Sequence, residues 1–292
     1  MTRRQVPSIL LPALLAVVAC SSPPPFPALF FGDPPDTEPV RLGPGIVSVE
    51  GETEMGCTFA PDASEFWFVR SVIQDDVEWP TLFVSRREPE GWSVPVPAPF
   101  DAETREFAPS ISPDGKRFFF YRQKPSDPDF REGTWVAERT EEEWGEPRFF
   151  HEAYNIVQDL DGVLYFNTEH RESSSRDIAT MRLEDGAFTE AEDLPGSANS
   201  DQFDAHPSVA PDGSFILFDS LRPDSLGGPG IHVTFRRPDG SWSPAQRLGD
   251  ELSFDWGGNT PCLAPGGDYL LFHADADLWW VSAEVIYRWR PH

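Results

Sequence analysis

Basic residues and cysteines are scarce in this chain of 292 residues. Lys and Arg together number 23 against 49 Asp and Glu, which gives a formal net charge of −26, and there are three cysteines. Such a charge repels phosphate groups, so we expect no nucleic-acid partner, whereas cations or basic protein surfaces are favoured. A solvated acidic surface without a specific partner would have the same composition.

Several motifs of catalytic sites are also absent. The sequence has no Gly-x-Ser-x-Gly nucleophile elbow, no phosphate loop and no dinucleotide-binding glycine pattern, and its histidines lack zinc-site spacing. No catalytic residue can be assigned, so the sequence leaves catalysis open and favours a non-catalytic role. Hydrophobic residues make up 39% of the chain, which is enough to build a substantial core.

An apolar run at the N-terminus, within residues 1–20, is too short to span a bilayer. It ends in Val17-Val18-Ala19-Cys20, which is similar to the lipobox of bacterial lipoproteins, in which the cysteine is lipidated. This resemblance implies that residues 1–20 are a lipoprotein signal peptide with a lipidated Cys20. Ser21 at the next position implies, by the same resemblance, an outer-membrane lipoprotein facing the periplasm or the cell surface. A secretory signal with a chance cysteine is the alternative. Residues 21–37 are rich in proline, so we expect a tether there and the folded domain over residues 38–292.

One turn motif recurs through the rest of the chain at intervals of about 50 residues. Each copy has a short apolar strand, a tight turn and a second apolar strand, which predicts a β-hairpin. Asp and Gly form such turns readily, so we expect Asp114 to be structural. The copies are CTFAPDASEFWFVR (57–70), PSISPDGKRFFFYR (109–122), NIVQDLDGVLYFNT (155–168), PSVAPDGSFILFDS (207–220) and PCLAPGGDYLLFHA (261–274).

Two further strand signals follow each of the first four hairpins, which predicts units of four strands. The fifth unit ends before a fourth strand can form, and EPVRLG (38–43) near the N-terminus matches PAQRLG (244–249) of the fourth unit. The sequence therefore predicts an all-β, five-bladed β-propeller of four-stranded antiparallel blades, closed by an N-terminal strand that completes the last blade.

The Pro-Asp-Gly hairpins and the closing segment LWWVSAEVI (278–286) resemble the TolB-type β-propeller repeats of bacterial envelope proteins. The resemblance covers nearly all of residues 38–292. Domains of that family are usually drawn with six blades and a separate N-terminal domain, so six blades is the alternative count. The chain has no room for the extra domain, so the resemblance does not imply that this chain binds the partners of TolB.

Polar residues just ahead of the inner strands, or at the ends of the second strands, are expected to converge at one mouth of the central channel. They are Glu54, Arg70, Glu106, Arg122, Tyr154, Asp204, His206, Trp256, Asn259 and His273. Their carboxylates could hold Ca²⁺, although no cofactor is required, or they could cap strand ends and bind water.

We expect a monomeric binding or scaffold module for an envelope protein, peptide or glycan. The alternative is a glycan-active hydrolase, sialidase-like or of another glycosidase class, that uses these carboxylates and arginines.

Cys57 and Cys262 remain after lipidation of Cys20, and each lies in the predicted inner strand of its blade. Closure of the ring makes the first and fifth blades neighbours, so the two sulfurs could meet across the closure. In an oxidising compartment they could form a disulfide. Two buried free thiols are the alternative.

Overall fold

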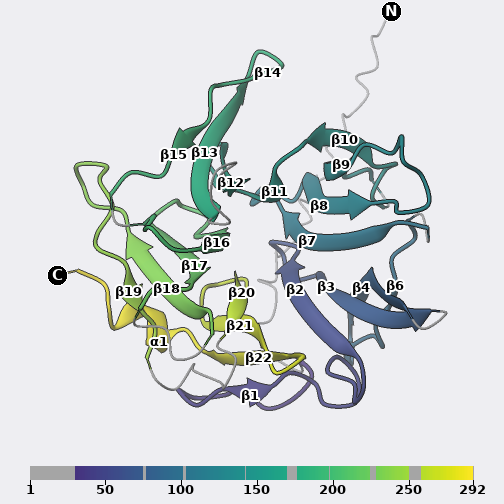
Figure 1. Cartoon of the computed structure of the whole chain (residues 1–292). Coiled ribbons are helices and arrows are strands. Elements are labelled where there is room, and N and C mark those ends of the chain that lie inside the picture. Colours follow the sequence, from purple (N-terminus) through teal and green to yellow (C-terminus); the bar gives the residue numbers. More distant parts are fainter. Residues whose placement is uncertain are drawn as a thin grey trace, which may run out of the picture.

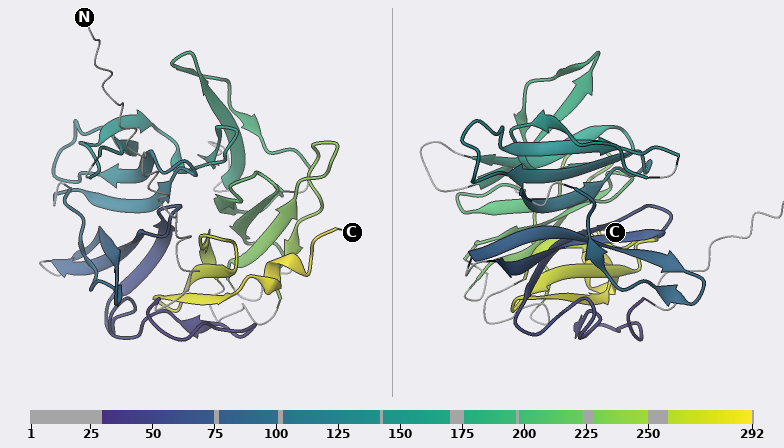
Figure 2. Two further views of the ribbon diagram at one scale, coloured as in Figure 1. Left: turned by 180° about the vertical axis from the view of Figure 1, so that it is seen from behind. Right: turned by 90° about the vertical axis from the view of Figure 1, so that its right-hand side faces the viewer.

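Five antiparallel sheets stand around a central axis like the blades of a propeller (Figures 1 and 2). The five-bladed prediction is confirmed, and the alternative of six blades is wrong. This computed structural model describes residues 30–74, 77–100, 103–141, 143–169, 176–196, 198–223, 228–249 and 258–291. In the described part, no helix is long and apolar enough to cross a membrane.

Within each blade the chain runs from the axis outwards, and each strand pairs with the one before it. Blade 1 holds β2 (Thr53–Phe59), β3 (Glu65–Gln74), β4 (Val77–Glu88) and β5 (Gly91–Trp92), with β6 (Val96–Pro97) also on β4. Blade 2 holds β7 (Arg105–Ile111), β8 (Arg117–Gln123), β9 (Gly133–Glu138) and β10 (Arg148–His151). Blade 3 holds β11 (Tyr154–Gln158), β12 (Val163–Glu169), β13 (Arg176–Glu184) and β14 (Ala187–Phe188), with β15 (Glu192–Asp193) also on β13.

Blade 4 follows the same plan with β16 (Asp204–Val209), β17 (Phe215–Ser220), β18 (Gly230–Phe235) and β19 (Gln246–Arg247). Blade 5 holds β20 (Asn259–Leu263), β21 (Tyr269–Ala274), β22 (Asp277–Ser282) and, as its outer strand, β1 (Val40–Arg41). The short helix α1 (Glu284–Tyr287) follows β22. Apolar side chains of neighbouring blades pack into clusters between the sheets, because each blade buries both of its faces.

The hairpin turns have the predicted structural role. Asp114 Oδ1 accepts hydrogen bonds from Ser112 Oγ at 2.6 Å and from the Lys116 N–H at 3.1 Å. Partial burial would raise the pKa of Asp114, but these donors and nearby cations outweigh it and lower the pKa. Gly115 follows with φ 71°, a left-handed conformation that glycine adopts without strain.

The ring is closed by strand β1, which pairs with β22 as predicted (Figure 1). Val40 lies opposite Trp280 and Arg41 opposite Trp279. The pairing continues past the strand, since the Leu42 N–H donates to the Leu278 carbonyl at 2.8 Å. The last blade is therefore assembled from both ends of the chain.

The segment ahead of β1 also packs into the domain. Phe30 is fully buried, and its ring lies 5.2 Å from that of Phe66 in blade 1 and 5.7 Å from that of Trp280 in blade 5. Phe30 belongs to residues 21–37, the predicted tether, so the part of that segment from Phe30 contributes to the core. Its ring fills the contact between the first and last blades.

Arg70 holds the loop that follows β1. Its Nη2 donates to the carbonyls of Val47 at 2.6 Å and Ile46 at 3.0 Å, and its Nε donates to Glu54 Oε1 at 2.8 Å. Both side chains of the ion pair are almost entirely buried. One guanidinium therefore ties the inner hairpin of blade 1 to the chain segment that closes the ring.

We predict that Arg70→Met lowers the free energy of unfolding by about 3 kcal/mol, because it leaves Glu54 buried without its partner and frees two loop carbonyls. Urea unfolding followed by tryptophan fluorescence measures the change. The matched control is Arg148→Met, which removes an exposed ion pair with Glu138 and should change stability by less than about 0.5 kcal/mol. Equal effects of the two substitutions would contradict the role of Arg70 in holding the loop after β1.

Candidate functional site

A cavity of about 650 Å³ runs along the axis of the ring. The inner strands of all five blades line it, together with the hairpin turns that follow them. The turn residues at its edge, among them Pro61, Leu160 and Asp212, are exposed to solvent. The cavity therefore opens on the face that carries the hairpin turns.

The wall of this axial cavity is mainly apolar, in contrast to the acidic surface of the chain. Two charged residues, Asp212 and Arg290, lie at the mouth among the described lining residues, and His206 lies deeper. Gln158 Oε1, on the wall, is buried and has no hydrogen-bond partner among the described residues. The larger apolar lining residues are Met55, Phe59, Phe107, Ile111, Val157, Leu160, Val209, Phe215 and Leu263, with prolines 61, 109, 113, 207, 211, 261 and 265.

Each inner strand carries a β-bulge at the same level of the cavity. The pairing register shifts between Met55 and Cys57 in blade 1, and at the equivalent place in the other four blades. The bulged residues have left-handed backbones and all line the cavity: Gly56 (φ 43°), Ala108 (47°), Asn155 (53°), His206 (50°) and Thr260 (48°). This conformation is unfavourable for a β-branched residue such as Thr260, so the packing of the ring must hold it.

The bulges also connect neighbouring blades by hydrogen bonds. The Gly56 N–H donates to Thr260 Oγ1 at 3.4 Å across blades 1 and 5, and the Thr260 N–H donates to Asp219 Oδ1 at 3.0 Å across blades 5 and 4. The His206 N–H donates to Asn167 Oδ1 at 3.1 Å across blades 4 and 3. At the level of the bulges, these bonds form a polar belt that links blades 1, 5, 4 and 3 in an otherwise apolar cavity.

A histidine–aspartate pair lies on this belt. His206 Nδ1 is 2.8 Å from Asp219 Oδ1, and Asp219 is 1% exposed. An ionised carboxylate only accepts hydrogen bonds, so Nδ1 carries the proton and Nε2 is the remaining polar atom of a side chain that lines the cavity. The pair can orient the imidazole toward a polar group of a ligand.

Two of the predicted site residues support this pair from blade 5. His273 Nδ1 lies 2.9 Å from Asn259 Oδ1, and burial lowers the pKa of His273. Three buried atoms near His206 lack a hydrogen-bond partner among the described residues, namely Asp219 Oδ2, Asn167 Nδ2 and His273 Nε2. A polar group that enters this region can therefore be satisfied without displacing existing bonds.

Tyr154 is a further predicted residue that lines the cavity. Its ring lies 5.8 Å from that of His206 and 4.9 Å from that of Tyr121. Burial raises the pKa of Tyr154 to about 12, so its phenol stays protonated at neutral pH. The structure therefore groups Tyr154, His206, Asn259 and His273 in one region of blades 3 to 5.

The predicted carboxylates are separated from that region and from one another. Glu54, Glu106 and Asp204 do not line the cavity, and each forms an ion pair inside its own blade. The Arg122 Nε lies 3.6 Å from Glu106 Oε1, and the Leu82 N–H also donates to this carboxylate at 3.4 Å. All three acids are at most 3% exposed.

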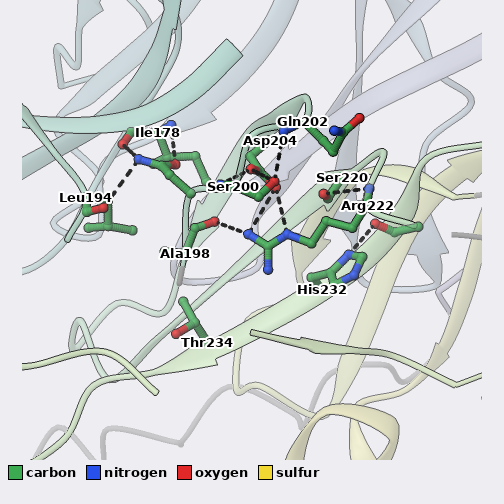
Figure 3. Close-up of polar contacts among 12 residues, drawn as sticks. Ile178, Leu194, Ala198, Ser200, Gln202, Asp204, Ser220, Arg222, His232 and Thr234 are labelled. Carbon is green, nitrogen blue, oxygen red and sulfur yellow. Dashed lines mark hydrogen bonds and ion pairs between the residues drawn. The ribbon is translucent and has the colours of Figure 1, made fainter. Parts of the chain in front are cut away.

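The pair in blade 4 shows what these arginines do (Figure 3). Arg222 donates to Asp204 Oδ1 from Nε at 3.2 Å and to the Ala198 carbonyl from Nη2 at 2.6 Å. Ser200 donates to Asp204 Oδ2 from both its N–H and its hydroxyl, each at 2.6 Å. The carboxylate and guanidinium thus fasten the loop that enters the blade, as Glu54 and Arg70 do in blade 1.

The sequence suggested Ca²⁺ because several carboxylates were expected at one mouth. Among the described residues, no group of three or more His, Cys, Asp or Glu side chains is arranged to hold a metal ion. Ca²⁺ binding stays an untested prediction. Trp256 and Cys20 lie outside the described residues.

Sequence reasoning missed Asp219, Asn167 and Gln158. Asp219 lies in β17, where all six side chains are buried, so a charged residue within the apolar segment FILFDS was the available signal. Asn167 occupies a similar place in β12. Gln158 directly precedes a hairpin turn and carried no signal, because a polar residue there is ordinary.

Comparisons with known proteins give no family assignment. No protein-family model matches the chain, and no curated protein does. Among solved structures, the chain is similar to TolB from Acinetobacter baumannii, at 15% identity and a TM-score of 0.49, over 78% of this chain and 54% of that one. It is also similar to a protein assigned as TolB from Agrobacterium tumefaciens, at 21% identity and a TM-score of 0.49, over 77% and 72%. The chain thus spans about half the length of the first of these, and the likeness carries no argument about function.

Glu54 predicts a pH dependence of stability. Burial raises the pKa of Glu54 from an ordinary 4.5 to about 7, and the Arg70 guanidinium offsets this in part. The native state therefore holds this proton more tightly than the unfolded chain does. Its stabilising effect is complete below about pH 4.5, and roughly 3 kcal/mol is lost as the pH rises to about 7.

Urea unfolding of the wild type and of Glu54→Gln between about pH 5 and about pH 8 tests this prediction. Glutamine does not titrate, so the difference in unfolding free energy between the two proteins should move against the wild type as the pH rises toward about 7 and level off above that pH. Comparing the two proteins cancels the repulsion among the many surface acids, which also changes with pH. Parallel pH profiles would show that Glu54 is ionised throughout.

Proposed function

We propose that the chain is a monomeric binding module whose axial cavity takes an apolar peptide segment of a partner protein from the hairpin-turn face. The observation that carries this proposal is the cavity of about 650 Å³, with mainly apolar walls, that all five blades line. Its volume falls within the range of ligand sites in proteins, roughly 300 to 1,000 Å³. Burial of apolar side chains against such walls supplies the affinity.

The polar groups of the cavity fit a peptide backbone. Gln158 Oε1 is a buried acceptor that can receive a backbone N–H, and His206 offers Nε2 deeper in the cavity. A ring of blades linked to one another by hydrogen bonds changes little on binding, so little ordering opposes association. The net charge of −26 favours segments with basic residues on either side of the apolar part.

The hydrolase alternative is less well supported. Glycosidases place two carboxyl groups about 5 to 10 Å apart on either side of the scissile bond. Glu54, Glu106 and Asp204 are instead buried in separate ion pairs with arginines of their own blades. Arg70 and Arg122 are likewise engaged in those pairs, so they do not form a cluster for a substrate carboxylate.

We propose in addition that the module is a bacterial envelope lipoprotein of TolB-like repeat type, anchored through Cys20. The support is the sequence Val17-Val18-Ala19-Cys20 at the end of a short apolar run, with Ser21 favouring the outer membrane. Several acyl chains on one cysteine would anchor it durably, since each buried methylene contributes about 0.8 kcal/mol.

Lipidation at Cys20 predicts that cells fed radioactive palmitate label the full chain and that Cys20→Ser abolishes the label. Wild-type protein should fractionate with membranes, while the variant should lose its acylated form. Cys57→Ser is the matched control, because it removes a cysteine of the folded domain and should leave labelling unchanged. Equal labelling of the Cys20→Ser variant and the wild type would contradict lipidation at Cys20.

Peptide binding is tested by selecting a phage-displayed library of random 12-residue peptides on the detergent-solubilised full chain. We expect enrichment of apolar peptides with flanking basic residues, and at least a tenfold loss of their affinity in Leu160→Arg. Leu160 lines the mouth of the cavity and is 64% exposed, so arginine there obstructs entry without disturbing the core. Fluorescence anisotropy of the labelled peptides measures the affinity.

The matched control is Ile73→Arg, since Ile73 is 65% exposed and lies at the end of β3 away from the hairpin turn. It should bind the selected peptides as the wild type does. Loss of binding in Ile73→Arg with retention in Leu160→Arg would place the site on the opposite face. Failure to enrich any peptide would contradict the peptide-binding proposal.

A further inference from the structure

Cys57 and Cys262 face each other where the ring begins and ends. Cys57 lies in β2, the inner strand of the first blade, and Cys262 lies in β20, the inner strand of the last. Both side chains are 7% exposed and belong to one apolar cluster, and both line the axial cavity. Both thiols are free in the structure.

The backbones beside the two thiols are held together. The Gly56 N–H, next to Cys57, donates to Thr260 Oγ1, two residues before Cys262, at 3.4 Å. Further along the same seam, the Glu54 N–H donates to the Ala276 carbonyl at 2.9 Å. Burial raises the pKa of Cys57, and the nearby Cys262 thiol raises it further. The Cys262 Sγ lies 3.8 Å from the carbonyl of Leu263. The shared buried cluster and the bond between Gly56 and Thr260 place the two cysteines side by side across the seam.

The seam between these strands is closed by little secondary structure. Inside the last blade, β1 contributes two residues to the pairing that joins the two ends of the chain. The inner strands β2 and β20 belong to different sheets, so no ladder of backbone hydrogen bonds connects them. A covalent bond between Cys57 and Cys262 would span about 200 residues and would prevent the seam from opening.

We propose that Cys57 and Cys262 are a disulfide-forming pair that locks the ring at its seam when the protein meets an oxidising thiol–disulfide couple. This inference does not depend on the proposed peptide binding. Small molecules can reach both sulfurs through the cavity, because both cysteines line it.

The reaction is a pair of thiol–disulfide exchanges. The thiolate of one cysteine attacks a sulfur of oxidised glutathione, forms a mixed disulfide and releases one glutathione thiolate. The second cysteine, as thiolate, then attacks the protein sulfur of that mixed disulfide and releases the second glutathione. The two cysteines lose two electrons and two protons, and the two glutathione molecules gain them.

The experiment uses the full chain incubated with oxidised or with reduced glutathione, then alkylated in denaturant and digested. Mass spectrometry should find a peptide pair joined through Cys57 and Cys262 after oxidation, and both cysteines alkylated after reduction. Peptide mapping is required because Cys20 is a third cysteine of the chain. In urea, the oxidised wild type should unfold at least tenfold more slowly than the reduced protein.

Cys57→Ser and Cys262→Ser are the matched variants, since each keeps a side chain of similar size and removes one sulfur. Unfolding rates of both should be the same after oxidation and after reduction. Three outcomes would overturn the proposal: both cysteines still alkylated after oxidation, a bond to Cys20 instead, or a Cys57–Cys262 bond that leaves the unfolding rate of the wild type unchanged.

Discussion

The pairing of β1 with β22 is the contact on which the ring depends. Each blade packs against its two neighbours, so a row of blades without closure would expose an apolar face at each end. The chain meets this constraint by placing two residues from near its N-terminus on the strand from near its C-terminus. Phe30 fills the same junction from the apolar side, and Arg70 holds the loop between β1 and β2 from the polar side.

Closure of five blades also determines what lies at the axis. The inner strands lie close enough to the neighbouring blades for bulged residues to make hydrogen bonds between blades, and these bonds support the left-handed backbones at His206 and Thr260. A bulge redirects side chains and interrupts the regular strand pairing, so the polarity of the cavity wall changes at this level. Apolar residues and prolines line the cavity on both sides of this level, for example Met55 before the bulge and Phe59 after it, whereas the polar belt lies at the bulges.

The buried ion pairs stabilise the loops that enter the blades and do not contribute to the cavity wall. Glu54, Glu106 and Asp204 lie near the beginnings of inner strands, where an incoming loop leaves backbone carbonyls that need donors. Arg70 and Arg222 supply those donors, and the carboxylate beside each compensates its buried charge. A repeated acid and arginine at strand ends therefore fastens the loop that enters the blade, whereas the polar groups beside the cavity are the less regular ones around His206.

The hairpins, their number and the closing strand could be predicted from the sequence. Those features depend on local patterns, such as the turn at Asp114 and the apolar run in RFFFYR, and on the match between residues 38–43 and 244–249. It also placed Cys57 and Cys262 at the seam, because the repeat count makes the first and fifth blades neighbours. The folded structure was needed to show that Glu54, Glu106 and Asp204 pair within their own blades while Tyr154, His206 and Asp219 gather near the axis. The direction of a side chain at a strand end depends on bulges and on inter-blade contacts between residues tens of positions apart, and no local pattern encodes those.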